Sequence, residues 1–172
     1  MIDLERRTDE RGFFARAFCE TEFAQRGLVT GFVQGNIATS VRKGTIRGLH
    51  YQVAPAEEAK LVRCSRGAIW DVIVDLRPDS KTYLKWCGIE LSDANGRQMY
   101  VPQGCAHGYQ TLIDDAEVSY LVSASYAPAY ERGIRWDDPL FNIEWPIVSH
   151  VDVSPKDRAW PDFAAASTVS RG

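Results

Sequence analysis

The sequence predicts an all-β fold, and two observations support this prediction. Short apolar or alternating runs recur along the chain, a pattern typical of strands rather than helices. Turn-forming pairs separate these runs, at Lys43-Gly44, Arg66-Gly67, Pro78-Asp79 and Asn95-Gly96. Many short strands at regular spacing favour a β-sandwich or a barrel.

Nine strands are expected, at Phe13–Phe18, Phe32–Ser40, Thr45–Val53, Lys60–Cys64, Ala68–Leu76, Leu84–Leu91, Arg97–Val101, Gly108–Leu112 and Val118–Ser125. The alternation is clearest in the fifth of them. There one face carries Ile69, Asp71, Ile73 and Asp75, and the opposite face carries Trp70, Val72 and Val74. One helix is expected over Glu22–Arg26, with Thr21 as its N-cap and Gly27 ending it. A second short helix is expected around Ser154–Trp160.

Length and composition indicate a single domain over residues 1–172, with disorder expected in a C-terminal tail from about residue 162. A formal charge of only −3 argues against nucleic acid or an anionic membrane as partner. The N-terminus is too polar for a signal peptide, and the most apolar stretch is too short to span a bilayer. Four cysteines without a CxxC pair are expected to be buried or semi-buried free thiols. These features predict a cytoplasmic protein.

Two motifs bear on the choice between a sandwich and a barrel. Val101–His107 has the PxGxxH form of the second cupin motif. The segment Gly48–Gln52, followed by Glu57-Glu58 and Gly67, resembles the first cupin motif, with Gln52 in place of the second metal-binding histidine. This resemblance implies a cupin-type double-stranded β-helix, or jelly roll, with a few short helices. The mouth of such a barrel holds a small molecule.

Both motifs carry a histidine, His50 and His107, and three functions are open at this point. A metal-dependent cupin oxygenase would use His50, Gln52, Glu58 and His107, but glutamine is a poor substitute for imidazole as a transition-metal ligand. Acid–base catalysis without metal or cofactor would use a histidine as base near neutral pH. A non-catalytic sugar-binding jelly roll would need neither a base nor an acid.

Further segments bear on this choice: DERGFF at 9–14, FVQGN at 32–36, RGLHYQ at 47–52, KLV at 60–62, DVIVDLR at 71–77, VPQGCAHGY at 101–109, IRWDDP at 134–139, IEWP at 143–146 and SPKD at 154–157. Together they resemble the dTDP-4-dehydrorhamnose 3,5-epimerase family of cupin-fold enzymes, which favours the acid–base hypothesis. They extend over nearly the whole chain.

The resemblance implies the roles of four catalytic residues. The histidine of RGLHYQ, His50, is the base that removes a proton beside the 4-keto group of a sugar. Asp157 orients this histidine and supports its protonated form. Lys60 places positive charge at the C4 oxygen, and Tyr120 returns a proton to the opposite face.

The resemblance also implies a nucleotide-sugar substrate and a homodimer in which an N-terminal strand joins the partner's sheet. In such a dimer, Phe14 or Arg16 would reach the partner's pocket. Arg11 and Arg47 match positions that contact a diphosphate, for which a guanidinium is well suited. Tyr126 matches a tyrosine that stacks on the base. The other implied substrate-binding residues are Phe14, Gln34, Asn36, His107, Glu131 and Lys156.

Some positions depart from the family pattern. Arg16 stands where the family has a glutamate that contacts the base, and a guanidinium can only donate hydrogen bonds. Gly35, Ile37-Ala38 and Tyr109 also differ. The sequence therefore predicts an epimerase acting at C3, at C5 or at both carbons of a 4-keto-6-deoxyhexose. The sugar is linked to dTDP or, as alternatives, to GDP or CDP.

Overall fold

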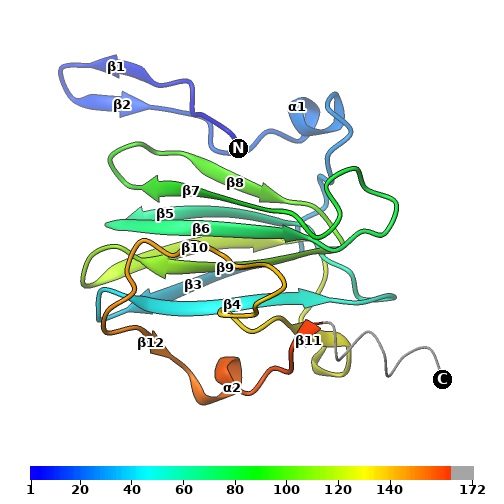
Figure 1. Cartoon of the computed structure of the whole chain (residues 1–172). Helices are drawn as coiled ribbons and strands as arrows, with labels where there is room; N and C mark the ends of the chain where they lie inside the picture. The colour runs from blue at the N-terminus through cyan, green and yellow to red at the C-terminus, as the bar shows by residue number, and fades with distance from the viewer. Residues whose placement is uncertain (164–172) are drawn as a thin grey trace.

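The computed structural model describes residues 1–163, and its core is a sandwich of two antiparallel sheets (Figure 1). One sheet has the order β3-β10-β5-β8, formed by Gln34–Ser40, Ala116–Val122, Lys60–Arg66 and Gln98–Val101. The other has the order β11-β4-β9-β6-β7, formed by Glu131–Gly133, Thr45–Gln52, Cys105–Thr111, Ala68–Asp75 and Trp86–Ser92. The predicted jelly roll is thus confirmed.

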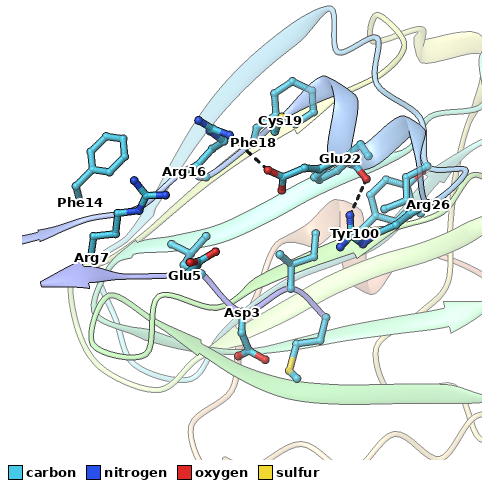
Figure 2. A pocket seen from close by; sticks show the side chains of 16 residues that line it. Asp3, Glu5, Arg7, Phe14, Arg16, Phe18, Cys19, Glu22, Arg26 and Tyr100 are labelled. Carbon is cyan, nitrogen blue, oxygen red and sulfur yellow. Dashed lines mark hydrogen bonds and ion pairs between the residues drawn. The ribbon is translucent and has the colours of Figure 1, made fainter.

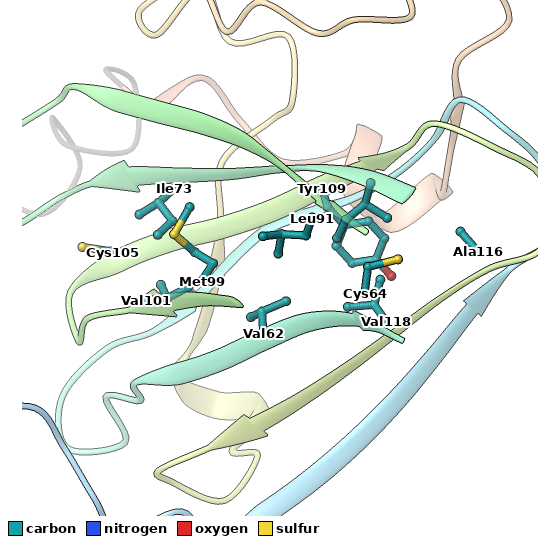
Figure 3. Packing of buried hydrophobic residues seen from close by; sticks show 11 residues of the cluster. Val62, Cys64, Ile73, Leu91, Met99, Val101, Cys105, Tyr109, Ala116 and Val118 are labelled. Carbon is teal, nitrogen blue, oxygen red and sulfur yellow. The ribbon is translucent and has the colours of Figure 1, made fainter. Parts of the chain in front are cut away.

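Side chains of both sheets fill the space between them (Figure 3). This inner core includes Val62 from β5, Leu91 from β7 and Val118 from β10, all at most 1% exposed. A second cluster covers the opposite face of the larger sheet, where Val72 and Val74 pack against the segment that follows β11. The alternation expected in β6 is therefore confirmed, because its two faces enter two different cores.

The chain after β11 wraps the outer face of the larger sheet. The short strand β12, Asp152–Val153, pairs in parallel with β4. Helix α2, Pro155–Arg158, follows directly and is capped by Ser154, whose side chain accepts a hydrogen bond from the Asp157 backbone N–H. The cap satisfies a backbone N–H at the start of this helix. The helix confirms the one expected around Ser154–Trp160, although it is shorter.

The N-terminal segment differs from its prediction. Instead of one strand over 13–18, a hairpin forms from β1, Arg7–Asp9, and β2, Gly12–Phe14. Helix α1 spans Glu20–Ala24 and is preceded by Cys19 as N-cap, without a side-chain capping bond, so the expected cap at Thr21 is wrong. A 3-10 turn, η1, at Pro128–Tyr130 was not expected.

The cysteines agree with the prediction except at one position. All four cysteines are free thiols; Cys64 and Cys105 are buried, but Cys87 is exposed, contrary to expectation. The disorder expected in the tail falls mainly on residues 164–172, which lie outside the described residues. Within residues 1–163, no helix is both long and apolar enough to cross a bilayer.

Candidate active site

Two adjoining cavities open beside β4, and three side chains line both of them: His50, Lys60 and Tyr120. The first cavity has a volume of about 430 Å³ and is also lined by Arg47, His107, Tyr109, Lys156 and Asp157. The second has a volume of about 290 Å³ and is also lined by Gln34, Asn36, Glu58, Tyr126 and Glu131. The structure thus brings together the four predicted catalytic residues and seven of the ten predicted binding residues.

His50 forms a hydrogen-bonded pair with Asp157. Its Nε2 lies 2.6 Å from Asp157 Oδ1, while the backbone N–H of Gly48 donates to Asp157 Oδ2 at 3.4 Å. Burial would raise the pKa of Asp157, but hydrogen bonds from His50, Gly48 and Ser154 and the charge of His50 outweigh it and lower this pKa. The carboxylate is therefore kept charged beside the imidazole.

The backbone around Gly48 explains how His50 enters the cavity. The register between β4 and β9 shifts between Arg47 and His50, which re-aims the side chains that follow. Gly48 has φ +114°, and a Cβ there would lie 2.6 Å from Gly108 Cα and 2.7 Å from the His107 carbonyl oxygen. Only glycine fits this close approach of two strands.

His107 forms a second histidine–carboxylate pair on the neighbouring strand. Its Nε2 lies 2.8 Å from Oδ1 of Asp71, a residue of β6 that is fully buried. Asp71 was not among the predicted site residues. Its position on the same strand face as Ile69 and Ile73 was the sequence feature that could have indicated a carboxylate inside the barrel.

Tyr120 and Tyr109 bring two phenols to the first cavity. Burial raises the pKa of Tyr120, the charge of Glu58 raises it further, and Arg47 lowers it. Burial raises the pKa of Tyr109 to about 12. Both hydroxyl groups therefore remain protonated at neutral pH and can serve as proton donors.

Lys60 is the buried cation of the site, whereas Arg47 and Lys156 are exposed. It is 8% exposed, and its Nζ lies 3.0 Å from Oε1 of Glu58. A buried ammonium group requires such a partner, since an unpaired charge in this environment is costly. The combination of Lys60 with two phenols offers positive charge and hydrogen-bond donors to an oxygen that becomes negative.

The predicted binding residues at the rim are linked to one another. The Tyr126 hydroxyl donates to Glu131 at 2.8 Å, and Lys156 Nζ forms an ion pair with Glu131 at 2.7 Å. The Gln34 side chain accepts a hydrogen bond from the Tyr126 backbone N–H. Arg47 donates to Ser40 and to the Thr39 carbonyl, which aligns its guanidinium along the cavity wall.

Three predicted binding residues lie outside these two cavities. Arg11, at the tip of the β1–β2 hairpin, is exposed and pairs with Asp9. Phe14 and Arg16 line a different cavity of about 620 Å³, between the N-terminal segment, α1 and Tyr100 (Figure 2). There Arg16 contacts Glu22 at 3.4 Å. Within one subunit, the hairpin does not contribute to the His50 site.

The residues at the cupin metal positions do not fit a metal ion. The Gln52 Oε1 accepts a hydrogen bond from the Ala127 N–H at 2.6 Å, and its Nε2 donates to the Ala56 carbonyl at 2.9 Å. Although Gln52 lines the second cavity, both its amide oxygen and its amide nitrogen are thus engaged by backbone groups. In the described part of the chain, no three His, Cys, Asp or Glu side chains are grouped as metal ligands would be.

Comparisons with known proteins identify the family. The family model described as dTDP-4-dehydrorhamnose 3,5-epimerase matches residues 1–165. The chain is 46% identical to the dTDP-4-dehydrorhamnose 3,5-epimerase of Sinorhizobium fredii over 155 residues, which cover 90% of this chain and 80% of that protein. The chain belongs to this family.

Solved structures agree with this assignment. A dTDP-4-dehydrorhamnose 3,5-epimerase from Bacillus anthracis, with TDP and PPi bound, superposes with a TM-score of 0.88 at 42% identity, covering 92% of this chain and 90% of that one. ChmJ from Streptomyces bikiniensis, a 3'-monoepimerase in complex with dTDP-quinovose, gives a TM-score of 0.88 at 32% identity, covering 98% and 85%. The family resemblance predicted from the motifs is confirmed.

Proposed function

We propose that this protein inverts C3, or C3 and C5, of a dTDP-linked 4-keto-6-deoxyhexose by acid–base catalysis without a metal. The observation that carries the proposal is the His50–Asp157 pair in a cavity shared with Lys60 and Tyr120. A C–H bond beside a carbonyl group is acidic because the resulting charge moves to the oxygen. The cavity supplies each group that such a reaction needs.

The reaction begins when His50 takes the proton from the carbon beside the C4 carbonyl. The electron pair of that C–H bond moves to the C4 oxygen, and the Lys60 ammonium stabilises the enolate. Tyr120 then delivers its proton to the opposite face of the same carbon, which inverts it. Exchange with water returns a proton to Tyr120 and removes one from His50, so that the enzyme is regenerated.

The binding residues support an anionic nucleotide at the same site. Arg47 and Lys156 provide positive charge at the first cavity, while Gln34, Asn36 and Tyr126 line the second. His107 lines the first cavity, where it would lie beside the hexose, and Glu131 binds Tyr126 and Lys156 at the rim. Bound TDP in the Bacillus anthracis relative favours dTDP over the GDP and CDP alternatives.

Inversion at C3 alone is the second candidate, and the similarity to the 3'-monoepimerase favours it. The same experiment tests both candidates. The protein is incubated in deuterated water with dTDP-, GDP- and CDP-linked 4-keto-6-deoxyglucose, and NMR follows each carbon. We expect deuterium at C3, or at C3 and C5, of the dTDP sugar. No exchange with any of the three sugars would contradict the proposed function.

Chelation distinguishes this mechanism from that of a cupin oxygenase. Because Gln52 is engaged by backbone groups, exhaustive treatment with EDTA should leave the epimerisation rate unchanged. The rate is measured before and after treatment, with added Zn²⁺, Mn²⁺ and Fe²⁺ as controls. Loss of turnover that one of these ions restores would contradict metal-free catalysis.

We further propose that the protein is a cytoplasmic homodimer whose β1–β2 hairpin lies on the partner. All six residues of the hairpin strands are exposed, and a two-stranded hairpin is marginally stable by itself. Strand β3 is an edge strand with Ile37 71% exposed. Exposed edges of this kind pair readily with another chain. In such a dimer, Arg11, Phe14 and Arg16 would complete the partner's site.

A further inference from the structure

The Glu58–Lys60 ion pair is a feature of the cavity that the proposed mechanism does not yet use. Glu58 Oε1 lies 3.0 Å from Lys60 Nζ, and the two side chains are only 11% and 10% exposed. Glu58 lies two residues before Lys60, at the end of the loop that leads into β5. Residues two apart in an extended chain project to the same side, which here is the second cavity.

The surroundings of Glu58 hold it in place. Gln52 Nε2 makes a long hydrogen bond of 3.4 Å to Glu58 Oε2, and Gln52 itself is fixed by the Ala56 carbonyl and the Ala127 N–H. The next residue, Ala59, is fully buried and donates its backbone N–H to Ser123 Oγ at 2.8 Å. Glu58 is therefore a carboxylate held in place beside Lys60.

A lysine requires such a partner if it is to act at one defined atom. Its ammonium group sits on a four-carbon stem with many rotamers and carries three N–H donors. The bond to Glu58 uses one of these donors and fixes the position of Nζ, which leaves two donors for the cavity. An enolate oxygen is stabilised best by donors that are already in place before the charge develops.

We propose that Glu58 is a positioning residue, which acts through Lys60 to place its ammonium group at the C4 oxygen. This inference rests on the proposed function, because it assigns Lys60 to the enolate. Glu58 also acts on the proton donor, Tyr120. Its negative charge adds to burial in raising the pKa of Tyr120, which keeps the phenol protonated. The carboxylate thereby supports both the electrophile and the acid.

The test replaces Glu58 by an uncharged side chain of equal size. Glu58→Gln keeps the shape and can still accept from Gln52, but it loses the charge that holds Lys60. We expect kcat to fall about 10- to 100-fold, since small misplacements of a catalytic group have effects of this size. KM for the dTDP sugar should stay within about twofold, because ground-state binding is unchanged. The matched control is Glu57→Gln, at an exposed neighbour outside the cavity, which should behave as the wild type.

A double-mutant cycle separates positioning from a structural role. If Glu58 acts through Lys60, then Glu58→Gln should cause no further loss of kcat in a Lys60→Met protein. Glu58→Asp keeps the charge but shortens the side chain by one methylene group, which moves the carboxylate away from Lys60. Its kcat should therefore lie between those of the wild type and Glu58→Gln. If Glu58→Gln does not fold, the kcat of Glu58→Asp relative to the wild type serves as the test instead.

The Tyr120 phenol gives a readout that does not depend on turnover. With ¹³C-labelled tyrosine, NMR titration should show a lower pKa for Tyr120 in Glu58→Gln than in the wild type. The other charged or titratable groups that line the two cavities stay the same in both proteins: Arg47, His50, Tyr51, Lys60, His107, Tyr109, Tyr126, Glu131, Asp152, Lys156 and Asp157. An unchanged Tyr120 pKa would contradict the second effect.

Failure of the positioning role and failure of the proposed function give different results. Unchanged kcat in folded Glu58→Gln, with an active wild type, would overturn the positioning role. A rise in KM alone would also overturn it, because Glu58 would then be a substrate-binding group. A wild-type protein that exchanges no deuterium with any of the three sugars would instead contradict the proposed function.

Discussion

At the scale of single residues, the site depends on two histidine–carboxylate pairs whose carboxylates are buried. Asp157 is 4% exposed and Asp71 is fully buried, and each faces one histidine of the cavity. The sequence motifs pointed to His50, Lys60, Tyr120 and Asp157 through family resemblance. They could not reveal Asp71 as the partner of His107, because contacts between side chains of neighbouring strands depend on strand register, which one sequence does not specify.

The pKa of Asp157 leads to a prediction for Asp157→Asn. Because this pKa is lowered from its ordinary 3.8, the carboxylate stabilises the fold above about pH 4, and this stabilisation is lost as the pH falls through the folded-state pKa. The difference in melting temperature between wild type and variant should therefore be greatest near neutral pH and shrink below pH 4. Thermal denaturation across this range measures it.

The same variant should exchange slowly, because an amide cannot stabilise the protonated imidazole of His50. We expect deuterium incorporation to fall at least about 100-fold at pH 7, a loss typical of impaired general-base catalysis. Exchange at the wild-type rate in folded Asp157→Asn would show that His50 acts without this partner.

Tyr120→Phe separates proton removal from proton return. The ring and its packing remain, while the donor is lost, so His50 can only return a proton to the face from which it came. We expect deuterium exchange with little inversion, the inversion rate falling by about two to four orders of magnitude. One NMR time course measures both. Normal inversion would instead point to Tyr109 as donor, since its phenol also lines the cavity.

At the scale of elements, strands with several alternating apolar residues were predicted to within a few residues. Strands β4 and β6 begin as expected, at Thr45 and Ala68. Each has buried apolar residues along most of its length, which makes it recognisable as a strand in the sequence. The strands β1, β11 and β12 were missed, since two or three residues are too few to show any period. Helix α1 begins earlier than predicted because its start has no side-chain cap to recognise.

The close approach of β4 and β9 predicts the effect of Gly48→Ala. The new methyl group would meet Gly108 Cα at 2.6 Å, in a backbone conformation that side chains rarely adopt. We expect the free energy of unfolding to fall by about 1–3 kcal/mol. We also expect slower deuterium exchange, because His50 would be displaced. Urea denaturation and NMR measure the two effects.

Gly31→Ala is the matched control for this variant. Gly31 has no positive φ, and a methyl group there would have no heavy atom within 4 Å. Its stability and exchange rate should equal those of the wild type within error. Equal effects of the two substitutions would contradict the proposed requirement for glycine at position 48.

At the scale of the whole molecule, the β1–β2 hairpin and the cavities lie apart within one subunit. In Figure 1 the hairpin stands at one end of the sandwich, whereas β12 and α2, which border the His50 site, lie at the other. Arg11 and Phe14 of the hairpin are exposed. In the proposed homodimer these residues would bind substrate across the interface, and each active site would contain residues of two chains.

Subunit complementation tests this arrangement. His50→Ala and Arg11→Ala should each form a dimer by light scattering, and each should have little activity. When the two are unfolded and refolded together, mixed dimers carry one site with both mutations and one site with neither. At equal concentrations half of the dimers are mixed, so about a quarter of all sites should be intact. Activity of the mixture that does not exceed the mean of its components would show that Arg11 does not act in the partner's site.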